Sequence, residues 1–258
     1  MTERENRYLA VNVGNTTTQL ALIRPGAAGK LPEILTRIEV QSNNLDLESI
    51  EAWLPCPADT PWFISSVFRT ADERLRAWIA ERYGVARVRR LTSSDFPIQV
   101  EVTEPNRVGA DRLAAAVAAG HLKSSMAAAI VVDVGTAITV DAIAVDRKFL
   151  GGAILPGVGI SARALHRYTD ALPLVELDPA TIPSALGKST VGAIQSGLHW
   201  GVLGAVRRLV DALQAELGFA EWDVFITGGG GHRFSDALTP VAMFRPDLVL
   251  LGTAIAAS

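Results

Sequence analysis

The stretch 131–140 constrains the fold most, because it has the pattern of a buried strand, a tight turn and a second strand with one carboxylate at the turn. Residues 127–132 are continuously apolar, which is typical of a strand covered on both faces. Asp133 ends this run, Gly135 permits a tight turn, and Thr136 adds a hydroxyl group. Such a turn suits a cation and phosphate oxygens. An ordinary hairpin explains one such turn equally well.

The beginning of the chain repeats this pattern. An apolar run leads into Asn12, and Gly14 and Thr18 follow. With position 12 set on position 133, an offset of 121 residues, Gly14 falls on Gly135 and Thr18 on Thr139. This spacing is too long for a solenoid repeat and suits one small domain. Two related phosphate-type turns at this spacing predict a duplicated fold with a cleft between its halves.

The composition limits the class of protein. A chain of 258 residues can form two α/β domains, and 49% apolar residues suffice for a large core. The net charge of −3 gives no basic surface for nucleic acid, and no apolar run approaches the roughly 20 residues of a membrane span. Cys56 is the only cysteine, so an internal disulfide is excluded and a reducing compartment is favoured. The charged N-terminus does not resemble a secretory signal, and we expect a cytoplasmic protein that binds neither nucleic acid nor membrane.

The order of elements is that of a mixed α/β fold without low-complexity linkers. The apolar patterns predict strands over 8–11, 19–23, 34–40, 62–67, 139–144, 224–227 and 249–251, and helices over 46–54, 70–83, 113–122, 162–166 and 191–217. Ser189 or Thr190 is expected to cap the last of these helices. The glycine run 151–159 contains too many glycines for an ordinary strand, and we expect it to bring backbone close to a ligand or to a domain junction.

Asp111 and Arg112 form a candidate substrate site at the start of the helix over 113–122. An acidic residue in a first helical turn often only favours the helix dipole, by about 0.3–1 kcal/mol. The neighbouring Arg112, however, can hold a carboxylate through its fixed fork of donors. Together they suggest that Asp111 takes a proton from a hydroxyl group while Arg112 anchors an acid.

Other motifs are less specific. Residues 187–190 resemble the tail of a P-loop, but Ile182 stands where that motif needs glycine, so a Walker-type site is excluded. The four glycines at 228–231 suit a nucleotide loop, although a glycine run alone is weak evidence. The histidines show no ligand spacing, and we expect neither a zinc site nor a catalytic triad. Small residues along 192–205 let another helix approach closely, within the fold or across a dimer.

Taken together, the motifs resemble type III pantothenate kinases in order and spacing over nearly the whole chain. The segments that carry the resemblance are 12–18, 65–67, 108–112, 133–137, 151–157, 187–190, 193–197 and 227–229. The glycine runs are unspecific when taken singly, whereas the ordered set is specific.

The resemblance implies an actin-like fold of two duplicated ribonuclease-H-like domains, over residues 1–115 and 116–258, with ATP in the cleft between them. It implies phosphorylation of pantothenate to 4'-phosphopantothenate, the first step of coenzyme A biosynthesis. It also implies a homodimer that needs Mg²⁺ and a monovalent cation, potassium or ammonium.

The resemblance also assigns roles by position. Asp111 is the expected proton acceptor, and Asp133 the expected ligand of the monovalent cation. The expected pantothenate contacts are Gly109, Ala110, Asp111, Arg112 and Thr190. The expected ATP contacts are Asn12, Val13, Gly14, Asn15, Thr16, Thr17, Thr18, Gln19, Thr136, Gly228 and Gly229.

Two positions depart from the family pattern. Asn12 stands where the family has aspartate, and Val102 stands where many members have a tyrosine that touches the substrate. Asparagine keeps the shape of aspartate but not the charge that Mg²⁺ prefers. Three hypotheses follow. They are a working pantothenate kinase with a water-bridged metal at Asn12, a weak or silent nucleotide-binding homologue with a regulatory role, and another sugar or acid kinase of the actin-like superfamily.

Overall fold

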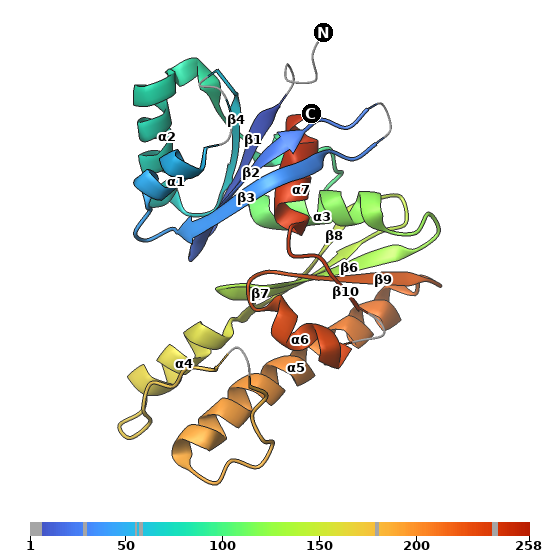
Figure 1. Cartoon of the computed structure of the whole chain (residues 1–258). Helices are drawn as coiled ribbons and strands as arrows, with labels where there is room; N and C mark the ends of the chain where they lie inside the picture. Colours follow the sequence, from blue (N-terminus) through green and yellow to red (C-terminus); the bar gives the residue numbers. More distant parts are fainter. Residues whose placement is uncertain (1–6, 28–29, 55, 57–58, 179–180, 239–241) are drawn as a thin grey trace. The chain divides into compact units, whose positions relative to one another are not determined.

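The computed structural model describes residues 7–27, 30–54, 56, 59–178, 181–238 and 242–258 (Figure 1). The chain forms two compact units. Unit 1 comprises Met1–Leu122, Arg147–Phe149 and Asp247–Ser258, and unit 2 comprises Lys123–Asp146 and Leu150–Pro246. In the described part of the chain, no helix is long and apolar enough to span a membrane.

Unit 1 contains a five-stranded sheet in the order β3-β2-β1-β4-β5. The β1–β2 and β2–β3 pairs are antiparallel, whereas β4 runs parallel to both β1 and β5. Its strands are β1 Tyr8–Val13, β2 Thr17–Arg24, β3 Glu33–Gln41, β4 Trp62–Ser66 and β5 Val88–Arg90. Its helices are α1 Leu47–Trp53, α2 Arg69–Tyr83, α3 Ala110–Leu122 and α7 Leu248–Ala257, with 3-10 turns at Val85–Arg87, Ser93–Asp95 and Pro105–Arg107.

Alternating side chains of β1 and β2 supply two separate apolar clusters in unit 1. Leu9 and Val11 belong to the cluster that contains Leu75 and Ile79 of α2. Tyr8 and Ala10 belong to the other, which contains Leu250 and Ala254 of α7. Because successive strand residues point to opposite faces, this sheet is covered on both sides.

Unit 2 repeats this arrangement, with the sheet order β10-β9-β6-β7-β8. Here β6 pairs antiparallel with β7 and parallel with β9, as β1 does with β2 and β4. The elements are β6 Ala128–Val134, β7 Ala137–Ile143, β8 Phe149–Pro156, α4 Val158–Arg167, α5 Thr190–Leu217, β9 Trp222–Thr227, α6 Gly231–Leu238 and β10 Ala242–Phe244. The duplicated α/β fold predicted from the two turns is therefore confirmed.

The long helix α5 packs on the sheet of unit 2. Leu203, Val206 and Val210 of α5 are buried in one cluster with strand residues and with Phe234 of α6. Ser189 caps this helix, because its Oγ accepts a hydrogen bond from the Gly192 backbone N–H at 3.1 Å. Of the two predicted caps, Ser189 is the one used.

Two sequence-based predictions about single elements are wrong. The predicted strand over 249–251 is part of α7, whose apolar residues pack on β1 and α3. The run 151–159 does contain a strand, since β8 covers Phe149–Pro156 and accommodates Gly151 at φ +100°.

The compact units also differ from the division predicted at residue 115. Helix α3 stays whole in unit 1, and the last twelve residues return to unit 1 because α7 packs against α3 and β1. At the α3–α7 contact, a Cβ atom on Gly252 would lie 1.7 Å from the Ala114 carbonyl oxygen. The two helices therefore touch backbone to backbone.

Candidate functional site

The N-terminal turn (residues 12–19) closes the β1–β2 hairpin. Asn12 pairs with Gln19 across the hairpin, and the Gly14 N–H donates to the Thr17 carbonyl at 3.0 Å. Asn15 and Thr16 are exposed at its tip. The side chain of Asn12 is partly buried at the strand end, and its Oδ1 accepts a hydrogen bond from the Ser65 hydroxyl at 3.3 Å.

The central turn (residues 133–139) has the same form in unit 2 but is one residue shorter. Asp133 pairs with Thr139, and the Gly135 N–H donates to the Ala137 carbonyl at 3.0 Å. The offset of 121 therefore holds up to the glycines only. Beyond the turn, the structural counterpart of Thr139 is Gln19, so the predicted match with Thr18 is wrong by one residue.

In each unit, the parallel strand next to the turn carries a hydroxyl side chain at the residue that pairs with Asn12 or with Asp133. Ser65 of β4 lies beside Asn12, and Thr227 of β9 lies beside Asp133 in the parallel register. The Thr227 hydroxyl is buried and makes no hydrogen bond within the described residues. A buried hydroxyl without a partner costs stability, so a ligand atom is the natural partner to expect here.

The glycine-rich turn (residues 228–231) joins β9 to α6 and lies against Asp133. A Cβ atom on Gly228, at φ +85°, would lie 2.4 Å from Asp133 Oδ1. The Gly230 N–H donates to the Val134 carbonyl at 3.0 Å. Gly229 is exposed, with open space around its Cα. The turn thus approaches the carboxylate closely and leaves Gly229 accessible to a ligand.

A further close approach comes from the glycine run. The Gly157 N–H donates to the Thr136 carbonyl at 3.1 Å, and a Cβ atom on Gly157 would lie 2.3 Å from that oxygen. The glycine run therefore approaches backbone closely at the central turn of the same unit, while the expected approach to a ligand or to a domain junction stays a prediction. Glycine is required at this position by the contact itself.

Asp111 lies in the first turn of α3 in unit 1. Its Oδ1 accepts a hydrogen bond from the Arg112 backbone N–H at 2.8 Å, and a Cβ atom on Gly109 would lie 2.5 Å from the same oxygen. Burial raises the pKa of Asp111 above its usual range, although the Arg112 N–H and the Arg112 charge oppose this shift. The Arg112 guanidinium lies over the Phe149 ring, 5.4 Å from its centre.

A carboxylate with a raised pKa that is held by local backbone hydrogen bonds suits proton transfer. Thr190 belongs to unit 2, where it is the first residue of α5, and its side chain is exposed. Because Ser189 provides the cap, the Thr190 hydroxyl is not needed for capping.

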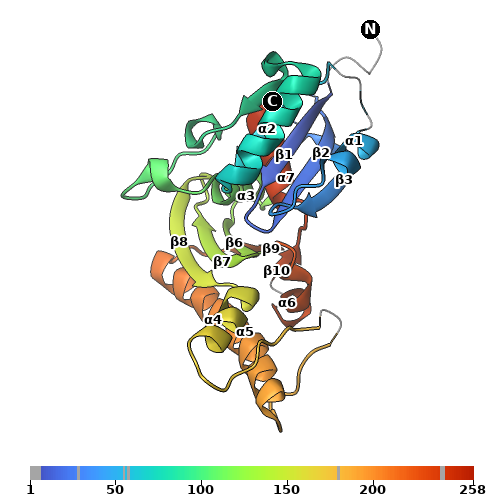
Figure 2. The same ribbon diagram turned by 90° about the vertical axis from the view of Figure 1, so that its left-hand side faces the viewer.

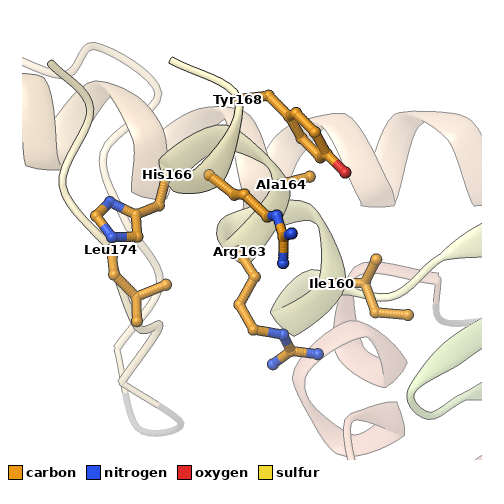
Figure 3. Close-up of a pocket in the computed structure, with 7 residues that line it drawn as sticks. Ile160, Arg163, Ala164, His166, Tyr168 and Leu174 are labelled. Atoms are coloured by element: carbon orange, nitrogen blue, oxygen red, sulfur yellow. The ribbon is translucent and has the colours of Figure 1, made fainter. Parts of the chain in front are cut away.

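Sequence reasoning missed one pocket in unit 2. It has a volume of about 600 Å³ and lies along α4 and the chain that follows it (Figure 3). It is lined by Ile160, Arg163, Ala164, His166, Arg167, Tyr168 and Leu174. None of the predicted site residues lines this pocket, and no motif in the sequence marks it.

The side chains and backbone around Asp133 decide whether a cation fits this site. Within the described residues, no three His, Cys, Asp or Glu side chains gather as a metal cluster. Around Asp133, the chain instead supplies one carboxylate, the backbone of Gly228, which lies close to that carboxylate, and the Thr227 hydroxyl. Oxygen donors of this kind fit a hard cation that keeps part of its water shell.

The sequence matches the family described as type III pantothenate kinase over residues 8–212. The chain belongs to the type III pantothenate kinase family. One relative of that name, from Chlorobaculum tepidum, is 31% identical over 251 residues, which cover 95% of this chain and 91% of the relative. Another, from Legionella pneumophila strain Paris, is 36% identical over 194 residues, 75% of each chain.

Solved structures support the fold of this pantothenate kinase. A chain from Campylobacter jejuni named for the Baf family of transcriptional activators has a TM-score of 0.61 at 18% identity and covers 96% of both chains. A chain from Sinorhizobium meliloti named for 2-dehydro-3-deoxygalactonokinase has a TM-score of 0.57 at 17% identity, covering 97% of this chain and 95% of that one. At these identities, the matches show the fold alone, and the predicted actin-like fold is confirmed.

Proposed function

We propose that this chain transfers the γ-phosphoryl group of ATP to the hydroxyl group of pantothenate, with Asp111 accepting the hydroxyl proton. The family assignment supports the reaction, and the raised pKa of a partly buried Asp111 at a helix start supports its role. Phosphoryl transfer depends on positioning and charge neutralisation, and a poised carboxylate can receive the proton. The Arg112 guanidinium suits the carboxylate of pantothenate. No observation favours the alternative of a silent homologue.

We assign the remaining contacts by unit. In unit 1, the N-terminal turn from Asn12 to Gln19 contacts the ATP phosphates, and Gly109 and Ala110 contact pantothenate. In unit 2, Thr136, Gly228 and Gly229 contact ATP, and Thr190 contacts pantothenate. Asp133 holds the monovalent cation, potassium or ammonium; the donors around it support this proposal. When bound, Mg²⁺ would neutralise charge on the phosphoryl oxygens.

The reaction itself is tested by the release of ADP from ATP by the purified protein. We expect turnover that requires both pantothenate and Mg²⁺ and that is faster in potassium or ammonium than in sodium. ADP release that is independent of pantothenate, or specific for a sugar, would contradict the proposal. We also propose a cytoplasmic location, which the single cysteine and the use of ATP support.

Replacement of Asn12 by aspartate tests the N-terminal turn. The Oδ1 atom keeps its hydrogen bond from Ser65, and the new negative charge would strengthen binding of the Mg²⁺ ion that accompanies the ATP phosphates. We expect Asn12→Asp to raise kcat/KM for MgATP by about tenfold. Asn44→Asp makes the same substitution at an exposed position of unit 1 outside this turn and is expected to change the value less than about twofold.

Equal changes of kcat/KM for MgATP in the two variants would show that position 12 does not contribute specifically to metal binding. A silent native protein that becomes active in Asn12→Asp would instead identify a kinase scaffold disabled at this residue.

We further propose a homodimer formed through unit 2. The α5 helix exposes Gly197, Gly201 and Gly204, none of which has another atom within 4 Å of an added Cβ. Large apolar residues are exposed in the same region, with Leu186 71% and Trp200 40% exposed. An open small-residue face beside exposed apolar residues is typical of a surface that another chain covers.

Gly201→Glu tests this surface, because a dimer would bury the new charge. We expect the native protein to have the mass of a dimer by light scattering and Gly201→Glu the mass of a monomer. Ala215→Glu, at another exposed position of α5, is expected to stay dimeric. A native monomer, or the same dissociation in both variants, would contradict the proposed interface.

A further inference from the structure

The α4–α5 connection (residues 168–178 and 181–189) is held by side chains that bind its backbone carbonyls. Figure 2 shows this segment, in yellow and orange, passing beside α5 and α6. The α5 donors are Gln195 to Glu176 at 3.3 Å, Trp200 to Pro183 at 3.0 Å and Ser196 to Ala185 at 2.8 Å. Carbonyl groups held in this way fix the path of the connection without using its side chains.

A further anchor comes from α6. The Arg233 guanidinium donates through Nη1 to the Thr181 carbonyl at 3.1 Å and through Nη2 to the Asp178 carbonyl. The Thr181 hydroxyl also donates to the Asp178 carboxylate at 2.6 Å, so the two residues that Arg233 contacts are bonded to each other as well. The planar fork of an arginine can serve two carbonyls at once, which a lysine cannot do with the same geometry.

Arg233 is itself firmly placed. Its backbone N–H donates to the Gly230 carbonyl at 3.2 Å, within the glycine-rich turn. The next residue, Phe234, is 1% exposed, and its ring stacks on His199 of α5 with centroids 5.4 Å apart. A continuous set of contacts therefore leads from the central turn, through the glycine-rich turn, to the connection.

The connection ends at the proposed pantothenate contact. The Gly187 backbone is in direct contact with the backbone of α5, since a Cβ atom on Gly187 would lie 2.3 Å from the Ala193 nitrogen. Ser189 then caps α5, and Thr190 is its first residue. Thr181 and Thr190 lie in the same short segment, so we expect loosening of the connection at Thr181 to shift Thr190.

Building on the proposed function, we propose that Arg233 is a positioning residue that links the glycine-rich turn to the segment carrying Thr190. It touches neither substrate in this assignment. It acts by holding the connection in the path that presents Thr190 to pantothenate.

Arg233→Met tests the link, because methionine keeps much of the apolar stem and removes the two donors. We expect hydrogen exchange of the amides in 181–187 to become about tenfold faster, since the segment opens locally more often. We expect KM for pantothenate to rise about fivefold, while kcat and KM for ATP change less than about twofold. Arg233→Lys is expected to fall between the native protein and Arg233→Met. Arg208→Met, at an exposed position of α5, serves as the matched control.

Unchanged exchange in 181–187 would overturn the link, and faster exchange with an unchanged pantothenate KM would overturn the positioning role. Equal increases in both KM values would also overturn it, since they would indicate general loosening of unit 2. A native protein without pantothenate-dependent turnover would contradict the proposed function. The exchange comparison would then still support or overturn the link by itself.

Discussion

Asp111→Asn is expected to lower kcat by about a thousandfold or more, within the range that a positioned general base contributes. Asparagine has the same shape and can still accept the Arg112 N–H through Oδ1, so the local structure is kept. What it loses is the ability to take up the hydroxyl proton. Measurement of pantothenate-dependent ADP release under saturating substrates checks this prediction.

The same substitution is expected to leave the melting temperature unchanged or to raise it near neutral pH. Because burial raises the pKa of Asp111 in the folded state, this carboxyl favours folding at low pH and loses that contribution as pH rises through the raised pKa. Asparagine removes the cost of burying the charged form. A site residue whose removal abolishes activity without loss of stability indicates that the position is kept for function.

The raised pKa also predicts a pH dependence for the native enzyme. The carboxyl group must be ionised to accept a proton, so kcat/KM for pantothenate is expected to fall as pH drops through the pKa of Asp111. The midpoint of this fall should lie above the ordinary value for aspartate. A midpoint at or below that value would contradict the role of general base.

Asp46→Ala is the matched control for these measurements. Asp46 caps α1, where its carboxylate accepts from the Ser49 backbone N–H at 3.0 Å and from the Ser49 hydroxyl at 2.6 Å. Its loss is expected to lower the melting temperature and to leave kcat unchanged, the opposite of Asp111→Asn. Similar kinetic losses in both variants would indicate that Asp111 acts only through the structure of unit 1.

The sequence predicted the two turns well because each depends on local chemistry. An apolar run, a polar residue and a glycine define a strand end and a turn without reference to other segments, and Asp133 and Asn12 both lie at such ends. The extra residue in the N-terminal turn could not be predicted in this way. Which carbonyl accepts the glycine N–H, Thr17 or Ala137, depends on backbone geometry rather than on residue type.

Contacts between distant segments were the part that sequence patterns could not supply. The carbonyls that Arg233 binds have no side-chain signature, because every residue carries the same carbonyl group. The error at 249–251 has a related cause. A short apolar run fits a buried strand and a buried helix equally well, and only the packing partners decide between them.

Those partners also decide the effect of a substitution at Gly252, the second large effect that we expect. Gly252→Ala adds one methyl group where α7 touches α3, and its Cβ would lie 1.7 Å from the Ala114 carbonyl oxygen and 2.4 Å from the carbonyl carbon. The obstacle is backbone, so no side chain can rotate away. The helices must separate instead, which opens gaps around the buried Leu250 and Ala254.

We expect this variant to lose about 4 kcal/mol or more of unfolding free energy, in the range reserved for severe packing defects. Denaturant unfolding monitored by circular dichroism checks the value. The intrinsic preference of helices for alanine over glycine, about 1 kcal/mol, works in the opposite direction and makes the test stringent. A variant of native stability would show that α7 does not lie against α3 as described.

Gly120→Ala provides the comparison within the same pair of helices. Gly120 is a buried residue of α3, but the nearest atom to its added Cβ is Cβ of Arg147, at 3.4 Å. A separation of 3.4 Å is ordinary van der Waals contact, so the change in unfolding free energy is expected to stay within about 1 kcal/mol. The two substitutions add the same methyl group to a buried helical glycine, but only the one at Gly252 would overlap backbone atoms. The difference between their unfolding free energies would therefore measure the backbone contact between α7 and α3 in unit 1.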